Sequence, residues 1–190
     1  MSELRVNNVS EVGGDAVISA GVLDSGSLPA GSIVDAQSVL KTDTFSSSVA
    51  AGANVAVTDL SITHTLKNAS NKLLIMAYFG QAGNSAGLGG CGIAAADDGT
   101  LIGVGTGVGS RAAVGAGGFP TGNSNTVVAV MPHIHLVYSP GDTNSHTYTV
   151  RAINISTSTQ TVYVNRAEND TDNLNNARAV SAITIQEVAG

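Results

Sequence analysis

Apolar and polar side chains alternate along much of this chain with the two-residue period that is typical of β-strands. In residues 54–66 the alternation puts four side chains on one face: Leu60, Ile62, His64 and Leu66. The same period appears in five further segments: 32–45, 126–139, 146–156, 159–167 and 179–190. Lys72–Gly80, by contrast, is a continuous apolar run, which predicts a central strand covered on both faces.

Residues that favour turns separate these segments, in clusters at 67–72, 139–145, 156–159 and 169–176. No stretch of a dozen residues carries the 3.6-residue apolar stripe of a helix. The pattern therefore predicts an all-β fold, an antiparallel β-sandwich or a barrel. The segment Lys41–Ser48 begins with strand alternation and ends in serines. Because residues 46–53 are small and polar, we expect them to form a loop between two strands.

Residues 80–118 depart from this pattern because they contain fourteen glycines. Glycine costs backbone entropy on folding, so two interpretations stay open for the segment. Its backbones pack closely, as on a symmetry axis, or it forms a set of long surface loops. Within it, Asp98-Gly99 favours a tight hairpin turn.

The first thirty residues are the second exception. Two short β-like pieces are followed by a linker at 24–32. Because such a segment cannot build a core alone, we predict an N-terminal arm, residues 1–30, that orders against another surface. Residues 31–190 are predicted to form the β-sandwich. The apolar side chains with which the arm is expected to dock are Leu4, Val6 and Val9.

Composition narrows the range of functions. The chain has 190 residues, enough to bury a sizeable core, with 43% hydrophobic and only 12% charged residues. Its net charge of −6 and its eight scattered Lys and Arg residues argue against nucleic acid or an anionic membrane surface as a partner. The N-terminus lacks the pattern of a signal peptide, which predicts synthesis in a cytosol. The single cysteine, Cys91, is expected to be a buried small hydrophobe.

Two glycine motifs match catalytic or cofactor-binding signatures but lack the structural context of those signatures. Gly83–Gly87 matches the G-x-S-x-G pattern of serine hydrolases around Ser85, and Asp142 and His146 follow in the order of a triad. Gly87–Gly92 matches the dinucleotide-binding pattern G-x-G-x-x-G. Both patterns require a helix after the motif, and the residues that follow make a poor helix. We therefore predict no enzyme and no cofactor.

Two further segments carry metal-ligating residue types. His133 and His135 lie two residues apart, so both are expected to project from one face of a strand. Such a pair needs further ligands to hold a metal, and three chains that meet on an axis can supply them. The alternative, an ordinary strand with two polar positions, is the interpretation that the neighbouring residues favour. Asn169–Asn173 lacks the spaced acids of a calcium loop and is expected to be a solvated hairpin tip.

Several motifs give the chain a family resemblance. They are KTDTFS (41–46), DLSIT (59–63), an apolar strand after NK (71–72), TYTVRAIN (147–154), an asparagine–arginine hairpin (162–172) and SAITIQEVAG (181–190). Together they resemble a β-rich domain of tailed bacteriophages, notably those of cyanobacteria and marine bacteria, found in tail-fibre-like or virion structural proteins. Most of the chain carries the likeness, and the first residues carry it more weakly. The histidines at 133 and 135 depart from the family pattern.

The resemblance implies a jelly-roll-like knob that forms homotrimers, similar in plan to the trimeric heads of tumour-necrosis-factor-like proteins. Composition supplies an independent reason. A sandwich with few charges and many small side chains can press one face against two copies of itself. The apolar area hidden between the copies then adds about 25 cal/mol per Å² to stability.

The function that these expectations imply is structural. The knob sits on the virion surface after synthesis in the host cytoplasm, and its arm docks on the major capsid protein or on a tail or adaptor protein. Because the chain has an arm and one knob but no shaft, capsid decoration or cementing is the first expectation. The alternative is a short tail fibre whose outer loops bind a host surface receptor. A glycan hydrolase is least favoured, because Asp97 and Asp98 are neighbours on a presumed turn and Glu168 has no identifiable partner.

Overall fold

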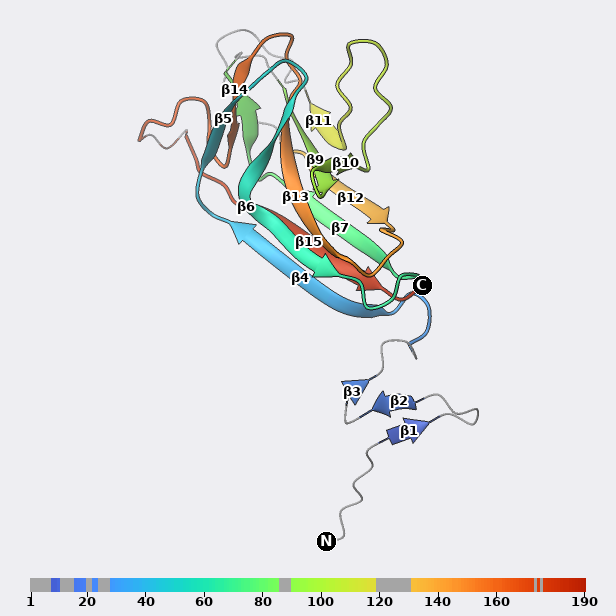
Figure 1. Ribbon diagram of the computed structural model, residues 1–190. Coiled ribbons are helices and arrows are strands. Elements are labelled where there is room, and N and C mark those ends of the chain that lie inside the picture. Colours follow the sequence, from blue (N-terminus) through green and yellow to red (C-terminus); the bar gives the residue numbers. More distant parts are fainter. Residues whose placement is uncertain are drawn as a thin grey trace.

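The computed structural model is all-β (Figure 1). It describes the strands within residues 8–23, and then residues 28–85, 90–118, 131–172, 174 and 176–190. None of these residues is helical, so no described segment forms a helix that could cross a membrane. All the strand pairs are antiparallel, which confirms the predicted fold class.

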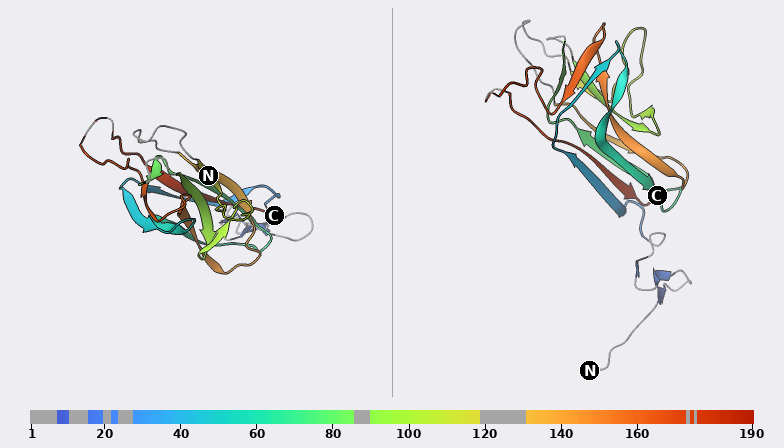
Figure 2. Two further views of the ribbon diagram at one scale, coloured as in Figure 1. Left: turned by 90° about the horizontal axis from the view of Figure 1, so that it is seen from above. Right: turned by 60° about the vertical axis from the view of Figure 1, so that its left-hand side comes forward.

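Two sheets pack face to face and form the body of the fold (Figure 2). In spatial order, the first contains β10 (Thr100–Ile102), β9 (Cys91–Asp97), β13 (Ser145–Asn154) and β6 (Asn54–Thr65), and β11 (Ala116–Gly118) pairs with β9. The second contains β12 (His133–Tyr138), β7 (Lys72–Tyr78), β15 (Ser181–Val188) and β4 (Ile33–Lys41).

Apolar side chains from both sheets meet in one core. They include Leu60 and Ile62 of β6, Ile93 of β9, Val150 of β13, Ile75 of β7 and Ile183 of β15. The four side chains predicted to share a face of β6 are all buried, which confirms the alternation. The core contains no tryptophan, so Ile, Val, Leu and Ala supply most of its volume.

A third sheet corrects one prediction. Its order is β5 (Phe45–Val49), β14 (Gln160–Val164) and β8 (Ala82–Asn84), so residues 46–49 are a strand and not part of a loop. These residues form a strand because β14 pairs with the whole of β5, from Phe45 to Val49. Ser46 and Ser48 are exposed, as polar side chains on an edge strand can be. The strand break itself lies at residues 42–44.

The glycine-rich segment packs closely within a single chain. β9 is buried along its whole length. A Cβ atom on Gly92 would lie 2.6 Å from the side chain of Val114, and one on Gly115 would lie 2.8 Å from that of Ile134. Close backbone packing therefore explains these glycines without a symmetry axis. The turn at Asp98-Gly99 joins β9 to β10 as predicted, with φ angles of 45° and 89°.

The first residues form a small sheet of their own, with the order β1 (Asn8–Ser10), β2 (Ala16–Ser19) and β3 (Val22–Leu23). Strands β2 and β3 lie within the second predicted β-like piece, residues 15–23, and β1 overlaps the end of the first, residues 4–9. At the start of the sandwich, the Gly31 amide donates to the Ala189 carbonyl at 2.9 Å, and the Ala189 amide donates to the Ser32 carbonyl at 2.8 Å. The C-terminus consequently lies beside the start of β4 (Figure 1).

Candidate functional site

The most distinctive surface is the side of the β12-β7-β15-β4 sheet that points away from the core, which we call the outward face. Residues opposite one another on paired strands share a face. The strand register gives the outward face three rows: His133, Tyr78, Ala182 and Leu40; His135, Met76, Thr184 and Ser38; Val137, Leu74, Gln186 and Ala36.

Seven of these twelve side chains are aliphatic, Met or Tyr, five are His, Ser, Thr or Gln, and none is charged Asp, Glu, Lys or Arg. Lys72, at the start of β7, lies on the same face just beyond the third row and is exposed. Leu40, Tyr78 and Val137 are 59%, 40% and 66% exposed. The face of an antiparallel sheet that meets water normally carries polar side chains in alternation with the core. The exposed Leu40, Tyr78 and Val137 therefore make this face a candidate contact surface.

The sequence of strand β7 also bears on how the outward face is covered. Its continuous apolar run predicts cover on both faces. Leu73, Ile75 and Ala77 point into the core and are buried, whereas Tyr78 on the outward face is exposed. On the outward face of the strand, Leu74 and Met76 are half-buried and Lys72 is exposed. The chain thus covers one face of β7 fully and the other only in part.

His133 and His135 both lie on the outward face, as their spacing predicts. They are exposed, and the residues opposite them on β7 are Tyr78 and Met76. The favoured interpretation, an ordinary strand with two polar positions, stays a prediction, and the metal alternative stays untested. Both histidines belong to β12, the edge strand of this sheet, and lie beside the apolar side chains of β7.

The motifs of the family resemblance meet in two buried polar clusters. The first, the Lys41 joint, holds the end of β4. The Lys41 side chain is fully buried, and its Nζ lies 2.8 Å from the Asp43 carboxylate and 3.6 Å from that of Asp59. The Asn165 side-chain amide donates to the carbonyls of Lys41 and Asp43, and the Ser181 hydroxyl donates to the Asn165 amide oxygen. These contacts explain why the strand breaks at KTDTF.

The second cluster, the Glu187 joint, holds the end of β15. The Glu187 carboxylate has no exposure, and it accepts hydrogen bonds from the Asn71 side chain at 2.6 Å and the Lys67 amide at 2.8 Å. His64 Nε2 lies 3.0 Å from the same carboxylate, and His64 Nδ1 faces the Gln37 amide at 3.1 Å. With Gln37 donating to Nδ1, the His64 Nε2–H donates to Glu187. Sequence reasoning identified His64 as a core position but not its partner.

A third polar cluster surrounds His146 at the start of β13. His146 Nδ1 lies 2.9 Å from Asp97, and Nε2 lies 3.1 Å from Asp142. The hydrogen bond with Asp142, and then the one with Asp97, raises the pKa of His146. The Tyr138 hydroxyl donates to Asp97, and burial together with this bond raises the pKa of Tyr138 to about 12. Because these bonds occupy both imidazole nitrogens, the cluster ties the β9–β10 turn to β13.

The serine-hydrolase triad does not form. The Ser85 hydroxyl accepts a hydrogen bond from the Thr161 amide and bonds the Gln160 side chain. Its neighbour Asn84 bonds Asn154, at the far end of β13 from His146. Those eight residues span about 26 Å of strand, so Ser85 and His146 do not meet. Asp142 and His146 do form a hydrogen bond, but it belongs to the polar cluster above.

The remaining candidates are the predicted docking residues of the arm, Cys91 and the G-x-G-x-x-G motif. Leu4 and Val6 lie outside the described residues, and Val9 lies in β1 opposite Ile18 of β2, so their docking role stays a prediction. Cys91 is buried as expected, and burial raises the pKa of its thiol to about 12. Half of the G-x-G-x-x-G motif, residues 87–89, lies outside the described residues, and Cys91 and Gly92 belong to β9.

No family model matches this chain, and no curated protein matches it either. The functional interpretation therefore depends on the chain's own residues and geometry.

Proposed function

We propose that the protein is a non-enzymatic structural component of a bacteriophage virion, a homotrimeric knob that decorates or cements the capsid surface. The observation that carries this proposal is the outward face, which exposes Leu40, Tyr78 and Val137 in the single chain and has no charged residue in its three rows. Two further copies of the chain cover it in the trimer. Each Å² of apolar area removed from water contributes about 25 cal/mol. The one charged side chain of β7, Lys72, lies at the end of the strand, where it can stay in water.

The strand order supports a jelly roll, the fold that the phage resemblance implies. Along the chain, β4 lies in the second sheet, β6 in the first, β7 in the second, and β9 and β10 in the first. β12 then lies in the second sheet, β13 in the first and β15 in the second. Eight strands that alternate between two sheets in this way are the pattern of a double-sheet jelly roll.

The two polar joints support a structural role for the motifs behind the resemblance. The Lys41 joint fixes β4, and the Glu187 joint fixes β15. Both strands belong to the sheet that carries the outward face. The motif residues thus act by holding the strands of the assembly surface in register, and none of them needs to touch a substrate.

We expect a chain without residues 1–30 to form the trimer but to be missing from virus particles. The hydrogen bonds of Gly31 and Ser32 with Ala189 remain in such a chain, so the sandwich keeps its first strand. The measurement is the amount of the protein in purified particles of a phage that encodes the shortened chain, with the full-length chain as control. Incorporation at the normal level would contradict docking through the arm. In the control, hundreds of copies per particle indicate the capsid, and a few dozen or fewer indicate the tail.

A further inference from the structure

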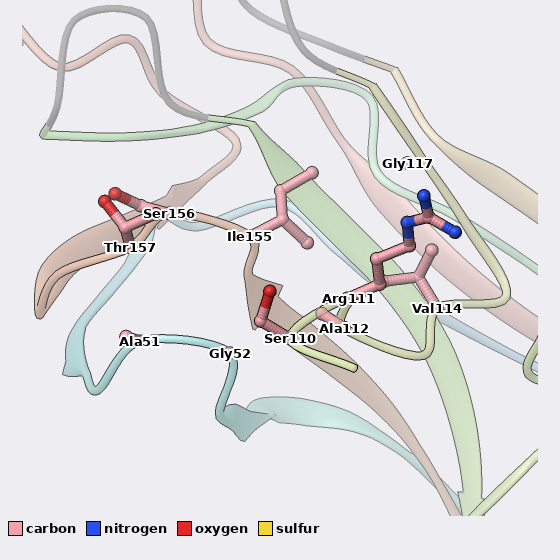
Figure 3. Close-up of a pocket in the computed structure, with 10 residues that line it drawn as sticks. All are labelled: Ala51, Gly52, Ser110, Arg111, Ala112, Val114, Gly117, Ile155, Ser156 and Thr157. Atoms are coloured by element: carbon pink, nitrogen blue, oxygen red, sulfur yellow. The ribbon is translucent and has the colours of Figure 1, made fainter. Parts of the chain in front are cut away.

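A pocket of about 640 Å³ opens at one end of the sandwich, away from the outward face. Three segments line it: the β5–β6 turn, the β13–β14 turn and the stretch before β11. Figure 3 shows Ser156 and Thr157 on one side, Arg111 and Val114 on the other, and Ile155 between them. Its volume lies in the range of pockets that take small molecules, and loops at the end of a rigid sandwich commonly carry binding sites.

Two walls of this pocket, the β5–β6 turn and the β13–β14 turn, are held in place by hydrogen bonds to one buried residue, Asn154. Its side-chain nitrogen donates to the carbonyls of Ala50 and Ser158, and its side-chain oxygen accepts from the Ser156 amide at 3.0 Å. The Gly52 amide donates to the Asn154 carbonyl at 2.9 Å. The β5–β6 and β13–β14 turns are therefore fixed before any ligand arrives, which lowers the entropic cost of binding.

The third wall, the stretch before β11, is fixed by a hydrogen bond to β9 and by one to Gly105. The Gly115 amide donates to the Ile93 carbonyl at 2.9 Å, and the Gly105 amide donates to the Val114 carbonyl at 3.0 Å. Val114 packs so closely on Gly92 that no side chain fits between them. This closed loop presents Arg111 at the rim of the pocket.

The polar groups of the pocket are unused within the described part of the chain. Arg111 has no ion pair or side-chain hydrogen bond there, and the hydroxyls of Ser110, Ser156 and Thr157 have no hydrogen bond either. Among the described basic residues, Lys72 alone shares this condition. None of the lining residues that the structure describes is acidic. Although the chain has a net charge of −6, the Arg111 guanidinium pairs with none of its described carboxylates, so it is available to bind an external anion.

We infer that this pocket binds an acidic sugar unit, with its carboxylate on Arg111. A guanidinium matches a carboxylate with two parallel hydrogen bonds. The three hydroxyls match the hydroxyl groups of a sugar ring, and the side chains of Ile155 and Val114 offer an apolar surface to its C–H face. This binding function goes beyond the structural role proposed above and needs only a single chain. On a virion it allows the knob to hold a carboxylated glycan on a cell surface.

The test compares methyl β-D-glucuronide with methyl β-D-glucoside, which differ only in a carboxylate in place of a hydroxymethyl group. Each is titrated into the full-length protein, and binding is followed by NMR chemical-shift changes. We expect a dissociation constant in the millimolar range for the glucuronide and binding at least about tenfold weaker for the glucoside. Acetate, which has the carboxylate without the ring, is expected to bind at least about tenfold more weakly than the glucuronide as well.

Two variants locate the site. Arg111→Gln should abolish the preference for the glucuronide, and Lys72→Gln, which removes the other unpaired cation, should leave it unchanged. Arg111 is exposed, so its replacement leaves the fold intact. Equal affinities for the two glycosides, acetate binding as tight as that of the glucuronide, no binding of either glycoside at 50 mM, or an unchanged preference in Arg111→Gln would each overturn the inference. None of these outcomes bears on the trimer.

Discussion

Replacing Met76 with aspartate should convert the trimer into a folded single chain. Met76 lies in the middle row of the outward face, on a central strand of its sheet. Burial of a carboxylate in an interface costs several kcal/mol per ion. Each interface should therefore weaken by at least about 4 kcal/mol, which is about a thousandfold in the association constant. Sedimentation velocity measures the change directly.

The control places the same charge on the opposite sheet. Ser61 is exposed on β6, on the side of the first sheet that points away from the core, so Ser61→Asp should leave the trimer intact. Circular dichroism of Met76→Asp should retain the β-spectrum of the wild-type protein, because the side chain points away from the core. A trimeric, fully associated Met76→Asp protein would show that another surface joins the copies.

Replacing Glu187 with alanine should produce the largest loss of stability. The change removes a fully buried carboxylate and leaves three donors without a partner, those of His64, Asn71 and Lys67. Removal of one partner from a buried charged network costs about 3–5 kcal/mol. Chemical denaturation at a fixed protein concentration should show this decrease in the free energy of unfolding.

Glu168→Ala is the matched control for this variant. Glu168 is exposed, and its carbonyl, which the substitution keeps, accepts a hydrogen bond from Arg166. Removal of its side chain should change the free energy of unfolding by no more than about 0.5 kcal/mol. Equal stability of the two variants would mean that the Glu187 joint contributes nothing to the fold.

Local patterns predicted much of the fold because they have local causes. The alternation in β6 follows from one buried and one exposed face, and the β9–β10 turn follows from the left-handed backbone that Asp98 and Gly99 adopt. Strand β5 was missed because its serines are poor evidence for a strand. Its existence depends on β14, more than a hundred residues later in the chain.

The functional surfaces were harder to predict because they depend on contacts between distant residues. The continuous apolar run of β7 predicted cover on both faces, but only the strand register and the burial show that the described residues cover its outward face in part. Glu187 and His64 are 123 residues apart in the sequence. The pocket is built from three separate turns, and nothing in the sequence near Arg111 indicates that Asn154 holds two of them.

The mass of the intact protein in solution tests the central claim most directly. Sedimentation equilibrium at micromolar concentration should give three times the chain mass of 18.9 kDa. A particle with the mass of one chain, stable and folded with its outward face in water, would contradict the account.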